Sequence, residues 1–261
     1  MDTLKNKWAL VTGASSGFGV EFAHVLAERG ANLILAARRT EPMDQLAQQL
    51  RTQYKVNVMI EGIDLGHYGA GINLKKRLDE RGIAVDILIN NAGFGLFGKF
   101  LEQPLSKTLE MLQLNMLNLT ELTHIFATDM VQRGAGHILL VSSIGAYQAT
   151  PTYAAYSASK AYVLLFGEAL NTELAPHNVK VSVLSPGVTA TNFFAVSGQK
   201  ATFYQRLMMM QARPVAKIGI RAMLAGKPSV VPGFLNKLTI FSNRFTPRSI
   251  QSRVAYLLMK N

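Results

Sequence analysis

Short apolar segments alternate with amphipathic segments along the chain. The apolar segments are rich in Ile, Leu and Val, as strands are when both faces of a parallel sheet are covered, and they lie at 8–12, 32–37, 56–60, 86–90, 137–142, 180–185 and 229–231. The amphipathic segments have helical spacing and lie at 18–29, 42–53, 67–81, 107–133, 154–175 and 214–225. This order predicts one α/β domain over residues 1–261, a doubly wound parallel sheet of about seven strands with helices on both faces.

The first predicted strand ends in a glycine-rich loop, "TGASSGFG", which opens the first predicted helix. In a doubly wound sheet, ligands bind beyond the carboxyl ends of the strands. Gly13, Gly17 and Gly19 would let a ligand approach the backbone, and the N-terminus of a helix attracts a phosphate. The loop therefore predicts a phosphate cradle, with a tight turn that binds nothing as the alternative.

The ends of the next strands indicate a dinucleotide with a 2′-phosphate. A free ribose 2′-hydroxyl usually meets an acidic residue at the end of the second strand, whereas a 2′-phosphate prefers Arg. Here Ala37 takes that place and Arg38 and Arg39 follow, which favours NADP over NAD; the alternative is that both are solvated loop charges. Asp64 ends the third strand, where it would accept a hydrogen bond from adenine, and "NNAG" ends the fourth.

The stretch around Tyr156 contains the candidate catalytic groups. Tyr156 and Lys160 are four residues apart on a predicted helix, so they face the same side. The pKa of a Tyr is ordinarily near 10, and a nearby ammonium group would lower it toward a range useful for proton transfer. The hydroxyl of Ser143, just after a predicted strand, would polarise a carbonyl oxygen, and Ser142 is a close rival for that role.

Together these segments resemble a known family. "TGASSGFG", "NNAG", Asn115, Ser143, "YSASK" and "SPGVTAT" appear in order and at matching spacings, and over residues 8–191 they resemble the short-chain dehydrogenase/reductase family. The tail also resembles a subgroup that includes acyl- and steroid-ketone reductases. The resemblance implies a Rossmann-like fold and an NADP(H)-dependent oxidoreductase. A binding protein that senses NADP(H) without turnover is the alternative.

The resemblance also implies a role for each matching residue. Tyr156 would be the acid in carbonyl reduction and the base in alcohol oxidation, and Lys160 would lower its pKa and bind the nicotinamide ribose. Ser143 would orient the substrate oxygen, and Asn115 would hold a water that relays protons toward Lys160. The other cofactor contacts would come from Gly13, Ser15, Ser16, Gly17, Phe18 and Gly19 at the pyrophosphate, from Asp64, Leu65, Asn91, Ala92 and Gly93 farther along the cofactor, and from Pro186, Gly187 and Thr191 beside the nicotinamide.

One departure from the family concerns the choice of cofactor. Some NADP-using members have a basic residue just before the second loop glycine, where this chain has Ser16. The preference for NADP therefore rests on Arg38, with Arg39 in support.

The segment at 192–213 matches the place of a mobile substrate lid in the family. Its aromatic and Met side chains would give an adaptable apolar surface. We expect a bulky apolar ketone or aldehyde as substrate, and core or dimer contacts are the alternative role for these residues. The candidate substrate-binding residues are Ser143, Phe94, Phe97, Tyr147, Tyr153, Phe193 and Phe194.

Composition narrows the remaining possibilities. The 261 residues include no Cys, which excludes disulfides and thiolate chemistry, and the five His are scattered, so no metal is expected. No apolar run approaches the roughly 20 residues of a membrane span, and the start lacks a signal-peptide pattern. We expect a cytoplasmic protein without a nucleic-acid partner. The family resemblance, rather than composition, implies a homodimer or homotetramer that pairs through the segments 107–133 and 154–175.

The charge is distributed unevenly. Residues 174–261 contain 12 Lys and Arg and no Asp or Glu, whereas the preceding part is close to neutral. The segment 234–261 is a basic amphipathic extension, in which Phe, Leu and Ile mix with Lys237, Arg244, Arg248, Arg253 and Lys260. Its expected contacts are an anionic membrane, an acyl carrier or a CoA phosphate. The alternative is a C-terminal helix packed on its own subunit with a solvated basic face.

Overall fold

A parallel sheet of seven strands forms the centre of the protein, within the residues that the computed structural model describes, 3–191, 193–199 and 202–259. The strand order is β3-β2-β1-β4-β5-β6-β9. All seven strands were predicted, and β3 begins at Val58, two residues later than expected. Their bounds are β1 (Trp8–Thr12), β2 (Asn32–Ala37), β3 (Val58–Gly62), β4 (Ile87–Asn90), β5 (Gly136–Val141), β6 (Val179–Leu184) and β9 (Ser229–Val230).

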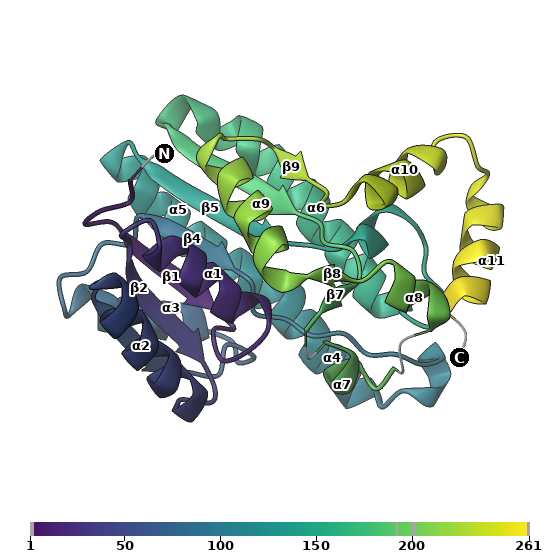
Figure 1. Ribbon diagram of the computed structural model, residues 1–261, viewed down its shortest axis with the longest axis horizontal. Helices are drawn as coiled ribbons and strands as arrows, with labels where there is room; N and C mark the ends of the chain where they lie inside the picture. Colours follow the sequence, from purple (N-terminus) through teal and green to yellow (C-terminus); the bar gives the residue numbers. More distant parts are fainter. Residues whose placement is uncertain (1–2, 192, 200–201, 260–261) are drawn as a thin grey trace.

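Helices cover both faces of the sheet (Figure 1). One face packs against α1 (Phe18–Ala27), α2 (Glu41–Tyr54) and α9 (Ala212–Leu224). The other packs against α3 (Ala70–Asp79), α5 (Leu119–Arg133) and α6 (Ala154–Leu174). Successive strand side chains point to opposite faces, so that Val11 belongs to the first core and Leu10 to the second. This two-sided burial explains why the strands are apolar throughout.

The chain reverses its direction of travel across the sheet between β1 and β4. β1 pairs with β2 on one side and with β4 on the other. The loops after β1 and β4 therefore lead to opposite faces of the sheet, and they leave a crevice beyond the carboxyl ends of the strands. This crevice is where the fold favours a ligand.

The long helix expected at 107–133 is divided in the structure. α4 (Leu105–Leu112) is followed by a π-helical segment (Gln113–Asn118) and then by α5. A π-helix adds a residue to the turn and often occurs at functional sites. The other boundaries differ from expectation by a few residues, and short 3₁₀ turns occur at Phe100–Glu102, Ile144–Tyr147 and Ala175–His177.

The part of the chain after β6 contains elements that the sequence did not predict. β7 (Thr189–Ala190) pairs with β8 (Met210–Gln211), and α7 (Phe193–Ser197) and α8 (Phe203–Leu207) lie between them in the chain. The C-terminal segment forms two helices, α10 (Phe234–Ser242) and α11 (Arg248–Met259). Figure 1 shows α10 and α11, in yellow, projecting beyond the sheet on the side of α8. Lys260, expected in the basic extension, lies outside the described residues.

Candidate active site

A cavity of about 860 Å³ follows the carboxyl ends of the strands. Its volume falls within the usual range for small-molecule sites, about 300–1,000 Å³. The loops after β1, β2, β3, β4, β5 and β6 supply much of its wall, and residues of α4, α6, α7, α8, α10 and α11 contribute to it as well. The crevice predicted from the strand order is thus a real cavity with contributions from distant parts of the chain.

The loop after β1 is held against the loop after β4. The hydroxyl of Thr12 accepts hydrogen bonds from the backbone N–H groups of Asn91 and Ala92, both at 2.9 Å. A Cβ on Gly13 would lie 2.9 Å from the Asn91 side-chain nitrogen, and Gly13 has a φ of 67°. Only a glycine therefore allows the two loops to approach so closely.

The N-terminus of α1 fits an anionic group. Gly17 precedes the helix with a φ of 58° and offers no side-chain cap, so the backbone N–H groups of the first turn are left for a ligand. A Cβ on Gly19 would overlap the carbonyl oxygen of Gly13, so this glycine packs the helix on the loop and lies behind the cavity wall. The loop thus has the form of a phosphate cradle, and its residues fit the pyrophosphate of a dinucleotide.

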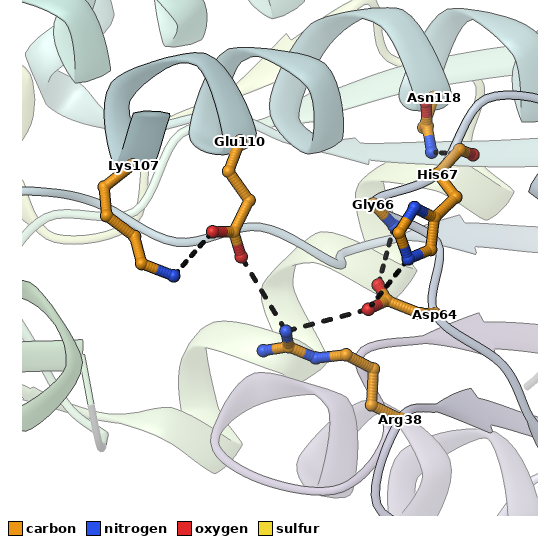
Figure 2. A network of polar contacts seen from close by, with 7 residues as sticks. All are labelled: Arg38, Asp64, Gly66, His67, Lys107, Glu110 and Asn118. Atoms are coloured by element: carbon orange, nitrogen blue, oxygen red, sulfur yellow. Dashed lines mark hydrogen bonds and ion pairs between the residues drawn. The ribbon is translucent and has the colours of Figure 1, made fainter. Parts of the chain in front are cut away.

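Arg38 lies between two carboxylates at one end of the cavity. Its guanidinium is 3.9 Å from Asp64 and 3.8 Å from Glu110, which also binds Lys107 at 2.7 Å (Figure 2). The side chain of Arg38 is 62% exposed. Ion pairs this long and exposed contribute less than about 1 kcal/mol, so an incoming phosphate can replace them. Arg39 lines the same end of the cavity.

The two neighbouring serines after β5 have different environments. Ser142 is buried, and its hydroxyl donates to the backbone carbonyl of Lys160 at 2.7 Å. The hydroxyl of Ser143 accepts from the backbone N–H of Gly145 at 3.1 Å, and it lies near the Tyr156 hydroxyl, whose pKa it lowers. The geometry therefore favours Ser143 over its rival, because the hydroxyl of Ser142 is engaged in holding α6.

Tyr156 and Lys160 lie close together in the cavity wall, with Asn115 behind them. The amine of Lys160 is 5.8 Å from the centre of the Tyr156 ring and donates to the carbonyl of Val141 at 2.9 Å. Asn115, in the π-helical segment, is fully buried and exchanges hydrogen bonds with the backbone of Phe94 at 3.1 and 2.9 Å. The π-helix thus brings an amide to the side of the Lys, although Asn115 itself does not line the cavity.

Burial shifts the pKa values of the central pair in opposite directions. Desolvation of the phenolate raises the pKa of Tyr156 above its ordinary value, and the neighbouring Ser143 hydroxyl works against that rise. Desolvation of the ammonium lowers the pKa of Lys160 to about 8. We expected Lys160 to lower the pKa of Tyr156, and the structure gives the opposite direction because the desolvation of the phenolate dominates.

Most of the predicted site residues line this one cavity. The exceptions are Gly19, Asn115, Phe97 and Tyr147. Phe97 packs against the ring of Tyr153 at 5.4 Å, and Tyr147 packs on the core. The predicted residues on the wall are Gly13, Ser15, Ser16, Gly17, Phe18, Arg38, Arg39, Asp64, Leu65, Asn91, Ala92, Gly93, Phe94, Ser143, Tyr153, Tyr156, Lys160, Pro186, Gly187, Thr191, Phe193 and Phe194.

Sequence reasoning missed several residues of the wall. Lys107 and Glu110 reach the wall from α4, and in the sequence they look like ordinary surface charges. Gln199 and Gln205 are buried in it and are joined through a hydrogen bond of 3.0 Å, and Tyr153 donates to Gln199 at 2.8 Å. No motif marks these positions. The helical spacing of Thr239, Ile240 and Asn243 was the one available signal that α10 contributes an inner face.

We predict that Lys160→Met stabilises the protein at pH 7. The lowered pKa of Lys160 means that burying its ammonium group costs on the order of 3 kcal/mol of folding stability, which the variant recovers. The variant loses about 1–2 kcal/mol of this gain, because the Val141 carbonyl no longer has its hydrogen-bond donor. The unfolded chain binds more protons between pH 8 and the ordinary Lys pKa of 10.5, so the gain is full below pH 8 and disappears as the pH rises through that window.

Thermal unfolding of the two proteins from pH 6 to 10.5 measures this difference. The matched control is Lys76→Met, on the exposed face of α3, which should change stability by less than about 0.5 kcal/mol. A difference between the Lys160→Met variant and the unchanged protein that does not vary with pH would contradict the assignment.

Comparisons with known proteins agree with this geometry. The family model for short chain dehydrogenases matches residues 7–202. A very-long-chain 3-oxoacyl-CoA reductase of Phaeosphaeria nodorum is 35% identical over 193 residues, which is 72% of this chain and 56% of the relative. The chain thus spans little more than half the length of the first curated relatives that it matches.

Solved structures match nearly the whole chain. A short-chain dehydrogenase from Sphingobium yanoikuyae, in complex with NADPH, has a TM-score of 0.82 and 29% identity, covering 92% of this chain and 93% of the other. A bulky-bulky ketone specific alcohol dehydrogenase from Comamonas testosteroni has a TM-score of 0.77 and 28% identity, with the same coverage of both chains. The chain belongs to the short-chain dehydrogenase/reductase family of oxidoreductases, with the Rossmann-like fold expected from its motifs.

Proposed function

We propose that the protein transfers hydride between NADPH and a bulky apolar ketone or aldehyde, or catalyses the reverse oxidation of the alcohol. The observation that carries this proposal is one continuous cavity with Arg38 at one end and Ser143, Tyr156 and Lys160 in its wall. The NADPH-bound structure of the Sphingobium yanoikuyae relative supports the choice of cofactor. NADPH would supply the hydride, and the protein must position the substrate and supply the proton.

Three parts of the cavity would hold the cofactor. The N–H groups at the start of α1 would bind the pyrophosphate, and Arg38 with Arg39 would bind the 2′-phosphate. The loop after β6, with Pro186, Gly187 and Thr191, would lie beside the nicotinamide. Asp64 is 3.9 Å from Arg38 and would accept a hydrogen bond from adenine when the phosphate takes over the Arg.

Tyr156 would deliver the proton. Its raised pKa keeps the hydroxyl protonated at neutral pH, as an acid for carbonyl reduction must be. The Ser143 hydroxyl would donate a second hydrogen bond to the same substrate oxygen and stabilise the charge that develops there. Lys160, protonated below about pH 8, would stabilise the phenolate left after transfer, and Asn115 would position a water on the path that returns the proton.

The substrate end of the cavity is largely aromatic. The Phe193 ring lies 5.4 Å from the Tyr156 ring and 6.2 Å from the Tyr153 ring, and Phe194 also lines the wall. The described parts of the segment 192–213, α7 and α8 among them, would act as the lid. An apolar wall next to a proton donor suits a bulky ketone or a long acyl chain, and the names of the two relatives support that class.

The alternative is a protein that binds NADP(H) without turnover. The same cradle and the same Arg38 would serve both functions, so cofactor binding alone does not separate them. The hydroxyl pair of Ser143 and Tyr156 favours the enzyme, because cofactor binding alone does not require two hydroxyl donors at the substrate end.

We predict that Arg38→Ala weakens binding of NADPH by about 10- to 100-fold and leaves NADH binding nearly unchanged, because a charge-assisted bond to a phosphate contributes about 1.5–3 kcal/mol. Glu110→Gln should strengthen NADPH binding, because it removes a carboxylate that competes for Arg38. Fluorescence titration with both cofactors measures these changes. Arg221→Ala, on the exposed side of α9, is the control. Equal binding of NADH and NADPH by the unchanged protein would refute the role of Arg38.

We predict that Tyr156→Phe lowers turnover at least about 100-fold and leaves the affinity for NADPH intact. The variant keeps the ring that packs against Phe193 and loses only the hydroxyl. NADPH absorbance with a panel of ketones, aldehydes and acyl thioesters measures turnover. Undiminished turnover would exclude Tyr156 as the proton donor, and a protein that binds NADPH but turns over no member of the panel would favour the sensor.

We also propose a homodimer or homotetramer that pairs through α4, α5 and α6. Leu109 on α4, Leu117 in the π-helical segment and Leu165 on α6 are 55%, 60% and 69% exposed, an apolar surface that pairing would cover. Leu165→Asp should shift the sedimentation coefficient toward that of the monomer. Leu101→Asp, on a loop where the Leu is 93% exposed, is the control. A monomer at every concentration of the unchanged protein would contradict the proposal.

A further inference from the structure

The helix α10 has an inner face that is part of the cavity. Thr239, Ile240 and Asn243 line the cavity at helical spacing. Asn236, one turn earlier on the same face, is only 2% exposed and donates to the carbonyl of Pro232 at 2.8 Å. A Cβ on Gly187 would overlap the Asn236 side chain, so the helix is seated directly on the loop after β6. Contacts with the cavity wall and with the loop after β6 therefore hold α10 in place.

The opposite face of α10 exposes an apolar stripe to solvent. Its members follow the spacing i, i+4, i+7, i+11. They are Phe234, Leu238 and Phe241 on the helix and Phe245 in the turn that follows it, exposed by 78%, 51%, 53% and 76%. We call these four residues the outer stripe. The stripe continues on α11, where Ile250, Val254 and Leu257 are 47%, 48% and 72% exposed. A surface helix normally turns its polar face outward, so this arrangement is inverted and marks an interaction surface.

Basic side chains border the outer stripe. Lys237, Arg244, Arg248 and Arg253 are all exposed on α10, α11 and the turn between them. The Arg244 guanidinium lies 6.0 Å from the Phe241 ring, so charge and apolar surface adjoin each other. From residue 174 onward the chain contains no Asp or Glu that could neutralise them. The partner of this surface must therefore be both apolar and anionic.

We propose that the outer stripe docks on the surface of an anionic lipid bilayer. Projecting aromatic and Leu side chains enter the boundary between headgroups and acyl chains, and the flanking Lys and Arg reach the lipid phosphates. These are the two components by which amphipathic helices bind an interface. The complementarity extends over two consecutive helices, α10 and α11, which suits a broad planar surface.

Docking would place the membrane next to the substrate cavity. The inner face of α10 lines the cavity and its outer face would lie in the lipid boundary, so that one helix, about 10 Å across, separates them. An apolar ketone dissolved in the bilayer would then need to pass only the edge of this helix. This consequence rests on the proposed function, whereas the docking itself does not.

Sedimentation with vesicles tests the docking directly. The probes are vesicles of phosphatidylcholine alone and of phosphatidylcholine with phosphatidylserine, each at low and high salt. We expect binding to the anionic vesicles at low salt, weaker binding at high salt and little binding to the neutral vesicles. Replacing Phe234, Phe241 and Phe245 together by Ser should abolish it, at roughly tenfold for each ring removed.

Charge and position are tested by two further variants. Replacing Lys237, Arg244 and Arg248 by Gln should weaken binding about fivefold for each charge removed. Tyr68→Ser is the matched control, because Tyr68 is 90% exposed on a distant loop and its loss should change nothing. Circular dichroism and thermal unfolding check that each variant is folded. Neither set includes a residue of the cavity wall.

The outcomes separate docking from turnover. The proposal is overturned if the unchanged protein binds neither kind of vesicle, or if the triple Ser variant binds as the unchanged protein does. It is also overturned if the outer stripe instead holds two copies together or binds an acidic acyl carrier protein without binding lipid. Vesicle binding by a protein that reduces no ketone would leave the docking intact and refute only the proposed function.

Discussion

Two hydrogen bonds join the end of β5 to the beginning of α6. The hydroxyl of Ser142 donates to the backbone carbonyl of Lys160, and the amine of Lys160 donates back to the carbonyl of Val141. Because the bonds run in opposite directions between the same two segments, they fix both the height and the rotation of the helix. Tyr156, one turn before Lys160, is thereby held beside Ser143. The arrangement of these three residues in the cavity wall thus depends on how α6 is held against the end of β5.

This seating requires a buried Lys without a carboxylate partner, and such a group costs stability. A buried group that lowers the stability of the fold often has a functional role. The proposed chemistry uses the same burial, because it keeps Tyr156 protonated as an acid beside a Lys160 that is protonated below about pH 8. The same burial that is unfavourable for folding thus prepares the proposed proton transfer.

The sequence predicted the sheet well because its signals are local. Each strand is a short apolar run, and the glycine-rich or polar residues that follow it predict a loop at the carboxyl edge of the sheet. The remainder depends on contacts between distant segments. The π-helix that presents Asn115, the competition of Glu110 for Arg38, and the burial of Gln199 beside Tyr153 have no local pattern. Tyr147 and Phe97 were placed in the substrate pocket because they are aromatic and close in sequence, but their rings pack elsewhere.

The C-terminal helix α10 connects the cavity with the exposed apolar surface. A basic and apolar tail was evident from composition, but only the structure shows that one face of α10 belongs to the cavity while the other is exposed. In the described part of the chain, no helix combines the length and the apolar character needed to cross a membrane.

The central claim is that the hydroxyls of Tyr156 and Ser143 act on the same substrate oxygen. A crystal structure of the protein with NADP⁺ and a bound alcohol or ketone would measure it most directly. The account predicts that both hydroxyl oxygens lie about 2.6–3.2 Å from that oxygen, with Arg38 on the 2′-phosphate. A substrate oxygen bound to neither hydroxyl, with Tyr156 turned away from the nicotinamide, would contradict it.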